Sequence, residues 1–301
     1  MTSLLERLNR LRFQRAVRAI RQTPPIRPGE RPFAALSMVR RTDVLPYLLA
    51  IKSFAQHTRP ERIILIADPS LTADDLGLIR RHAPAVEILP AERFRHPALP
   101  IGGTWERLAA IAALNADCSI VQLDADTVTF AEPEEVVRAA CEGRTFVLRA
   151  KRGVEIVDLE AAAAEGRARL AQSQHIQVAV EARLTELPAP ERFRYARGCS
   201  GFTGFGRGAL SPEKLQLVSG QMRTLHGERW DEWGTEQVTS NLLAASTPGA
   251  FLLPHPRYCN ADPAIEATVF SHYIGYARFR TRDYEKRARQ TARHLRSAPA
   301  A

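Results

Sequence analysis

The sequence lacks the features that are typical of membrane-spanning, secreted and dinucleotide-binding proteins. Its 301 residues include four widely spaced cysteines and no C-x-x-C pair, which excludes a zinc knuckle and a disulfide framework. No apolar run approaches the roughly 20 residues that cross a bilayer, and the N-terminus is too rich in arginine for a secretory signal. No G-x-G-x-x-G follows the first predicted strand, so the dinucleotide-binding fingerprint is absent. We therefore expect a globular protein of the cytoplasm with reduced thiols.

Positive charge is in excess, and it lies at the two ends of the chain. The net charge is +9, with six arginines and one glutamate in residues 1–21, and seven arginines, one lysine and two acidic residues in 276–301. The segment between them is slightly acidic, which argues against a nucleic-acid partner. We predict three parts: a basic helix and linker at 1–30, one domain at 31–280 and a basic tail at 281–301.

The first part has the pattern of an amphipathic helix. Leucines recur at helical spacing in residues 4–11, arginines fill the other face, and Pro24-Pro25 ends the segment. Such a helix can lie on an anionic membrane surface, which would put the protein on the inner face of the membrane. The alternative is a helix that packs on the domain. The sequence leaves both interpretations open.

Strands and helices alternate from residue 33 onward. Apolar runs predict strands at 33–39, 62–67, 86–89, 120–123, 145–149, 251–253 and 269–273. Helical spacing and start signals predict helices at 43–57, 72–82, 104–115, 132–142, 212–224 and 235–245, with one or two more inside 155–187. The alternation predicts an α/β fold with a mixed, mainly parallel sheet flanked by helices, Rossmann-like in its first half. The glycine-dense stretch 195–208 predicts an ordered strand or bulge.

The stretch Ser119–Val128 organises this pattern. Its buried strand ends in two carboxylates, Asp124 and Asp126, with one residue between them. Ligands of open α/β sheets bind beyond the carboxyl ends of the strands, and paired carboxylates there can share a divalent cation with phosphate oxygens. The spacing therefore favours a site for a nucleotide diphosphate, with a solvated acidic turn as the alternative.

Four stretches, in this order along the chain, resemble the GT-A-fold nucleotide-diphosphosugar glycosyltransferases, and family 8 among them. They are Asp124-Ala125-Asp126 after an apolar strand, Gly201-Phe202-Thr203-Gly204-Phe205, Thr235-Glu236-Gln237, and Ser271-His272-Tyr273-Ile274-Gly275. The resemblance covers about residues 33–280. It departs from the family after the first strand, where Met38 to Asp43 replaces an acidic residue followed by Asn and Tyr, and at Glu236, where the family has Asp.

The resemblance implies a metal-dependent transfer of a sugar from a nucleotide-diphosphosugar. His272 would complete a metal site with Asp124 and Asp126, and this donor set suits Mn²⁺ or Mg²⁺. Glu236 and Gln237 would act at the reacting sugar. The donor would be a UDP-sugar, and the acceptor a glycan or a lipid-linked carrier.

Four further residues are expected to contact the donor: Arg107, Ser37, Asp68 and Gly275. Arg107 lies one helix before the aspartate pair, where its guanidinium can grip a phosphate or hold an aspartate. An ordinary surface arginine is the alternative, as an inert strand-end histidine is for His272 and a helix-start acid is for Glu236. Two other functions stay open: a non-catalytic relative that binds nucleotide or glycan, and a sugar-nucleotide nucleotidyltransferase, whose glycine-rich phosphate loop is missing.

Overall fold

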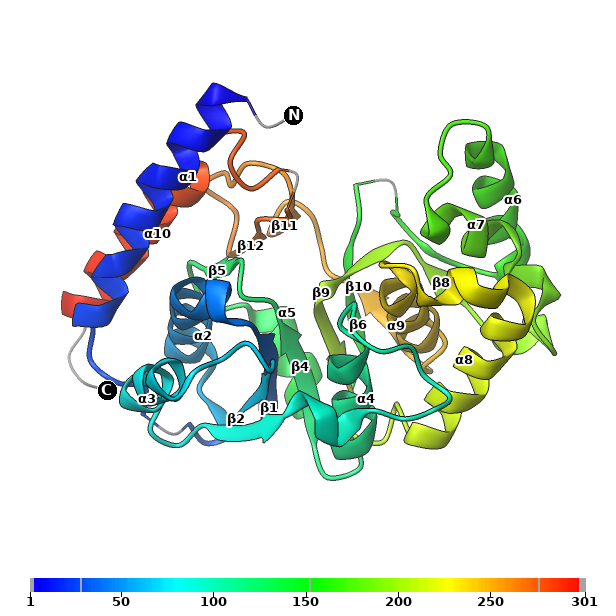
Figure 1. The fold of residues 1–301 in the computed structure, drawn as a ribbon, viewed down its shortest axis with the longest axis horizontal. Helices are drawn as coiled ribbons and strands as arrows, with labels where there is room; N and C mark the ends of the chain where they lie inside the picture. Colours follow the sequence, from blue (N-terminus) through cyan, green and yellow to red (C-terminus); the bar gives the residue numbers. More distant parts are fainter. Residues whose placement is uncertain (1–2, 28, 152, 276, 298–301) are drawn as a thin grey trace. The chain divides into compact units, whose positions relative to one another are not determined.

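The chain folds into two compact units, and Figure 1 labels the helices and strands of both. The computed structural model describes residues 3–27, 29–151, 153–275 and 277–297. Unit 1 consists of Met1–Pro90, Leu123–Val137 and Pro254–Ala301, and unit 2 of Ala91–Gln122 and Arg138–Leu253. The main sheet has seven strands in the order β10-β6-β9-β4-β1-β2-β3. Most of its described pairs are parallel and helices flank it, so the predicted fold class is confirmed.

Unit 1 contains three parallel strands of this sheet: β1 (Arg31–Val39), β2 (Pro60–Ala67) and β3 (Glu87–Pro90). Residues 33–36 of β1 and 64–66 of β2 are buried, as expected for parallel strands covered on both faces. The connections are α2 (Val44–Thr58) and α3 (Ala73–His82). α3 begins at a capping box, because Thr72 and Asp75 satisfy each other's backbone N–H groups.

A second, small sheet in unit 1 brings distant parts of the sequence together. Its order is β11-β12-β5, with β5 at Thr127–Thr129, β11 at Tyr258–Asn260 and β12 at Phe270–His272. β12 is parallel to β11 and antiparallel to β5. Of these three strands the sequence predicted only β12.

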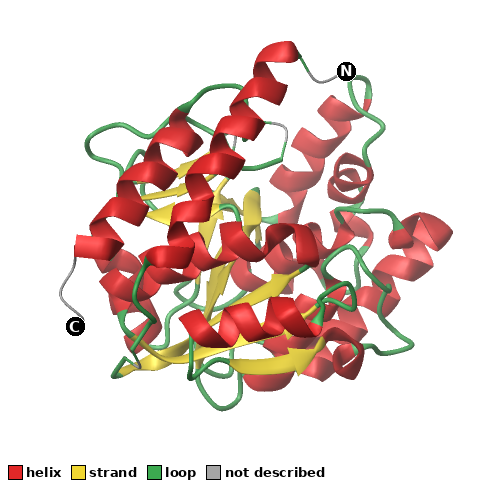
Figure 2. Cartoon of the chain, turned by 60° about the vertical axis from the view of Figure 1, so that its left-hand side comes forward, coloured by secondary structure: helices red, strands yellow, loops and turns green. Residues whose placement is uncertain are grey.

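Two helices from the ends of the chain lie side by side in unit 1 (Figures 1 and 2). They are α1 (Leu4–Val17), continued by a 3₁₀ turn at Arg18–Gln22, and α10 (Asp283–Ser297). Both contact α2. The sequence predicted α1, but it assigned no helix to the basic tail. Among the residues that the structure describes, no helix is long and apolar enough to cross a membrane.

Unit 2 contains the remaining strands of the main sheet and most of the other helices. Its strands are β4 (Ser119–Leu123, whose last residue belongs to unit 1), β6 (Phe146–Arg149), β9 (Gly198–Phe205) and β10 (Phe251–Leu252), with a two-stranded pair formed by β7 (Ile156–Val157) and β8 (Tyr195–Ala196). Its helices are α4 (Trp105–Leu114), α6 (Leu159–Leu170), α7 (Ile176–Ala182), α8 (Pro212–His226) and α9 (Thr235–Ala245); α5 (Glu134–Cys141) joins the two units in sequence.

The glycine-dense stretch is an ordered strand, as predicted. β9 is buried along its whole length and runs antiparallel to β6. A Cβ on Gly204 would lie 2.1 Å from the ring of Phe146, so any larger residue there would force that ring or the strand to shift. The predicted insertion at 155–187 contains α6 and α7, which pack on each other.

Candidate metal centre and buried carboxylate cluster

Hydrogen bonds hold the end of β4 in place just before Asp124, the first of the two aspartates. Leu123 is buried, and its carbonyl accepts a hydrogen bond of 2.6 Å from the hydroxyl of Ser37 on β1. The chain then turns through Asp124 to Asp126, and the hydroxyl of Thr127 donates to the carbonyl of Asp124 at 2.8 Å. The aspartates thus lie in a short, hydrogen-bonded turn between β4 and β5, at the strand end where the sequence predicted them.

The small sheet brings His272 next to the two aspartates. In the antiparallel pairing of β12 with β5, His272 lies opposite Thr127, directly after Asp126. The backbone N–H of Tyr273 donates to the carbonyl of Asp126 at 2.8 Å, which continues the pairing past the strand end. A strand of three residues thereby places an imidazole from near the end of the chain beside two carboxylates from its middle.

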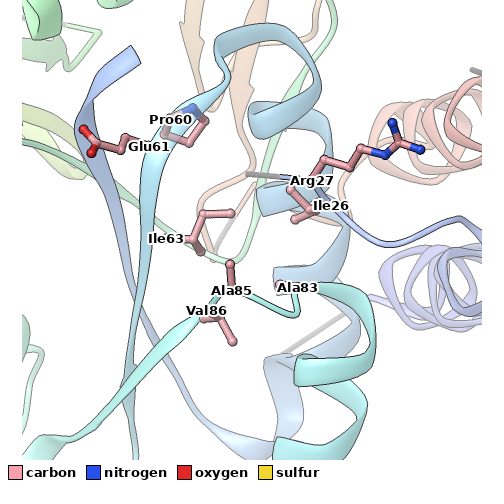
Figure 3. Close-up of a pocket in the computed structure, with 8 residues that line it drawn as sticks. All are labelled: Ile26, Arg27, Pro60, Glu61, Ile63, Ala83, Ala85 and Val86. Carbon is pink, nitrogen blue, oxygen red and sulfur yellow. The ribbon is translucent and has the colours of Figure 1, made fainter. Parts of the chain in front are cut away.

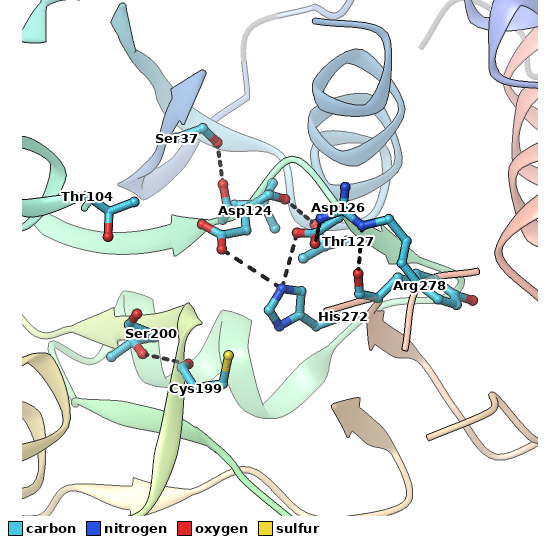
Figure 4. Close-up of polar contacts among 12 residues, drawn as sticks. Ser37, Thr104, Asp124, Asp126, Thr127, Cys199, Ser200, His272 and Arg278 are labelled. Atoms are coloured by element: carbon cyan, nitrogen blue, oxygen red, sulfur yellow. Dashed lines mark hydrogen bonds and ion pairs between the residues drawn. The ribbon is translucent and has the colours of Figure 1, made fainter. Parts of the chain in front are cut away.

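Asp124, Asp126 and His272 point toward one another (Figure 4). The Nε2 atom of His272 lies 3.1 Å from Oδ1 of Asp126 and 3.9 Å from Oδ2 of Asp124. One ligand atom from each of the three residues lies within 4.8 Å of the other two. Asp126 and His272 are buried, and Asp124 is half-buried. Two carboxylate oxygens and one imidazole nitrogen form a donor set that fits Mn²⁺ or Mg²⁺.

An arginine that the sequence did not single out completes the cluster. The guanidinium of Arg278 makes a short ion pair with Oδ2 of Asp126, and its Nε donates to the carbonyl of Tyr273 at 3.1 Å. Burial raises the pKa of Asp126, but the positive fields of His272 and Arg278 outweigh it and lower that pKa to about 2. Asp126 is therefore ionised at neutral pH, as a metal ligand must be.

The other residues predicted to contact the donor in unit 1 lie at three different places. Ser37 is buried, and its hydroxyl donates to Leu123. Asp68 follows the carboxyl end of β2, where its carboxylate accepts from the backbone N–H of Ser70 at 2.9 Å. Gly275 is exposed in the turn that leads from β12 toward Arg278. Ser37 thus supports the strand that precedes Asp124, and donor contacts by these residues stay predictions.

The second cluster lies in unit 2 and is centred on Glu236. This carboxylate, near the start of α9, accepts hydrogen bonds from Arg107 at 3.2 Å and from the hydroxyls of Ser200 and Thr104 at 3.0 Å each. Arg107 and Glu236 are both buried. Burial raises the pKa of Glu236, while Arg107 and the hydroxyl donors oppose the rise. The structure thus brings together two of the predicted site residues, and it adds two hydroxyl donors that nothing in the spacing of the sequence indicated.

The residues around Glu236 differ sharply in exposure. Gln237 is half-buried. Trp230 is fully buried, and its indole N–H donates to Ser219 at 3.0 Å, so it is a core residue. Trp233, in contrast, is 70% exposed. Two tryptophans three residues apart in the sequence thus differ in burial.

A hollow elsewhere in unit 1 does not compete with the carboxylate clusters as a site. It is lined by residues of the first linker, the start of β2 and the segment before β3, among them Ile26, Pro60 and Val86 (Figure 3). These residues lie at the amino ends of the strands, whereas ligands of α/β sheets bind at the carboxyl ends. Its lining is mostly apolar and provides no cluster of groups for chemistry.

No protein family model and no curated protein matches the sequence. Solved structures match its fold, and a glycosyltransferase is among them. The fold is similar to that of the WbbM bifunctional glycosyltransferase in its apo form, with a TM-score of 0.55 and 11% identity over 89% of this chain and 51% of the other.

Two further glycosyltransferase structures match at lower scores. The galactosyltransferase LgtC, solved with donor and acceptor sugar analogues, has a TM-score of 0.48 at 12% identity over 88% of this chain and 97% of its own. Mouse xyloside xylosyltransferase 1 has 0.44 at 12% identity over 80% and 97%. The chain spans about half the length of the WbbM structure. At 11% identity that likeness shows the fold alone, and membership of family 8 stays a prediction.

Proposed function

We propose that this protein is a metal-dependent glycosyltransferase that moves a sugar from a nucleotide-diphosphosugar to an acceptor hydroxyl. One observation carries the proposal: within a GT-A-type fold, two aspartates and a histidine converge beyond the end of a buried strand, with ligand atoms within 4.8 Å of one another. The donor set is oxygen-rich with one imidazole, which suits Mn²⁺ or Mg²⁺. These three residues come from two of the stretches that carry the family resemblance, Asp124-Ala125-Asp126 and Ser271-His272-Tyr273-Ile274-Gly275.

Sugar transfer requires that the diphosphate leaving group be neutralised as its bond to the sugar breaks. A bound divalent ion supplies this as a Lewis acid, and Asp124, Asp126 and His272 are the residues that would hold it. Arg278 adds a fixed positive charge beside Asp126. Guanidinium groups bind phosphate oxygens through paired N–H donors, so Arg278 joins the residues proposed to contact the donor, which are Arg107, Ser37, Asp68 and Gly275.

We propose different roles for Glu236 and Gln237. Glu236 is buried among Arg107, Ser200 and Thr104, so it acts by fixing the start of α9 and the charge there. Gln237, the next residue, is half-buried, and it is the one of the two that we propose to meet the sugar. The acceptor in this proposal is a glycan or a lipid-linked carrier, the donor is a UDP-sugar, and the location is the cytoplasm, on the inner face of a membrane.

The test is nucleotide binding that depends on metal. Uridine and guanosine diphosphates are screened by thermal shift with Mn²⁺ and with EDTA, because a ligand that binds only the folded state raises its apparent stability. We expect UDP with Mn²⁺ to raise the melting temperature, and Asp124→Asn or Asp126→Asn to abolish the rise. Asp117→Asn, an exposed aspartate in a turn, is the matched control and should keep it.

The result can also contradict the proposal. Metal-independent binding, or undiminished binding in both aspartate variants, would rule out the metal centre. Metal-dependent binding without release of UDP from UDP-sugars, across a panel of glycan acceptors, would instead indicate a non-catalytic relative that binds the nucleotide.

A further inference from the structure

The helix α1 presents an apolar surface to solvent. Leu4, Leu5, Leu8 and Leu11 are 75%, 55%, 42% and 52% exposed. At 100° per residue, Leu4, Leu8 and Leu11 form one stripe along the helix and Leu5 lies beside it. Single exposed leucines need no explanation, but a row of four on one helix marks an interaction site. The row is not a frayed end, because Ser3 and Glu6 close a capping box at the helix start.

The opposite side of α1 already has its partners. Phe13 is buried and stacks on Tyr284 of α10, with ring centroids 3.9 Å apart. The side-chain amide of Asn9, also buried, donates to the carbonyl of Phe279 at 3.0 Å. Ala16 and Val17 complete this inner side. The helix therefore packs on unit 1 through a mixed polar and aromatic side, and the leucine stripe faces away from it.

Arginines flank the leucine stripe. By helical spacing Arg7, Arg15 and Arg18 lie within about 60° of it on the outer side, and all three are exposed. Each carries a fork of donors that suits phosphate oxygens. The expectation of leucines on one face and arginines on the other is thus wrong, because both kinds of residue share the exposed side of α1.

We propose that the outer side of α1 is a docking surface for an anionic lipid bilayer, in which Leu4, Leu5, Leu8 and Leu11 enter the interface and Arg7, Arg15 and Arg18 contact lipid phosphates. A second copy of the chain is a poorer occupant, because it would bring the two rows of arginines against each other. The charge balance favours a negative partner, and the leucines favour one with an apolar interior. Phe13 is buried and provides no aromatic anchor, so binding depends on lipid charge and is reversible.

The experiment is sedimentation of the intact protein with vesicles of phosphatidylcholine, with and without about a third of phosphatidylglycerol. EDTA is present and nucleotide is left out, so the outcome does not depend on the proposed sugar transfer. We expect binding to the anionic vesicles at low salt, release at about 0.5 M salt, and little binding to neutral vesicles. Leu8→Asp should weaken binding at least about tenfold, because it removes an inserted side chain and adds a repelled charge.

Leu217→Asp is the matched control. Leu217 is a 61% exposed leucine on α8 of unit 2, so the same substitution there should leave vesicle binding unchanged. Circular dichroism and the melting temperature verify that both variants fold. The proposal is overturned if the intact protein ignores anionic vesicles at low salt, or if the two variants bind equally. It is also overturned if Leu8→Asp converts a dimer to a monomer without any change in vesicle binding, since α1 would then dock on a second copy.

Discussion

Replacing Arg278 by alanine should tighten the binding of Mn²⁺ in the absence of nucleotide. The guanidinium occupies one oxygen of Asp126, and it would repel a divalent ion held by the same carboxylate. Unit charges about 4 Å apart interact by about 1 kcal/mol in water and about 4 kcal/mol near a protein surface. Since the side chain of Arg278 is 23% exposed, solvent screens part of this, and we take a net gain of about 1.4 kcal/mol, or about tenfold in affinity.

The assay is a calorimetric titration of Mn²⁺ into metal-free protein at pH 7.5 and low salt. Asp126 stays ionised in the variant at this pH. Its pKa is about 2 in the unchanged protein, and His272 still lies 3.1 Å from it in the variant. Arg282→Ala is the control, since it removes an equal charge from an arginine that pairs with Glu285 at 2.9 Å. If Mn²⁺ binds more tightly by the same factor in both variants, the cause is the change in net charge and not the ion pair of Arg278 with Asp126. Weaker binding in the Arg278 variant would refute competition and show that Arg278 orients Asp126 for the metal.

Two predictions concern the fold itself. Burial and the nearby Lys52 lower the pKa of His82 to about 4, so between about pH 6.5 and 4 the unfolded chain binds a proton that the folded one does not; stability should fall by about 1–2 kcal/mol from pH 7 to 5. Chemical denaturation at the two pH values measures this, and a His82→Gln variant with the same pH dependence would contradict it. Gly204→Ala should cost about 1–3 kcal/mol, because its Cβ would meet the ring of Phe146. Gly220→Ala, in a helix with open space around it, should be neutral or stabilising in the same melting experiment.

The sequence predicts those parts of the site whose residues lie close together along the chain. An apolar run followed by Asp124 and Asp126 indicates a strand end with two carboxylates, because burial and turn chemistry both act within a few residues. The place of His272 depends on β12 pairing with β5, two strands of three residues each, which are too short to show a periodic pattern. The His272 prediction came from the family resemblance, and the sequence did not indicate Arg278 at all.

The helix α1 shows a second limit. Its periodicity indicates two different sides, but it does not say which of them meets the protein. The polar Asn9 is buried because one backbone carbonyl accepts its amide, while the leucines stay outside. Likewise, the sequence places Glu236 at a helix start, but its burial depends on Arg107 and Ser200, which arrive from other elements.

The bond from Asn9 to Phe279 has a consequence for any shortened form of this protein. Phe279 directly follows Arg278, so one hydrogen bond and one covalent step separate α1 from the ion pair on Asp126. Phe13 covers Tyr284, which in turn stacks on Tyr273, the residue after His272. Removing the first 22 residues would take away these contacts with Phe279 and Tyr284. The N-terminal helix thus supports residues next to the cluster, and a shortened chain with poor metal affinity would say nothing against Asp124, Asp126 and His272 as the proposed ligands.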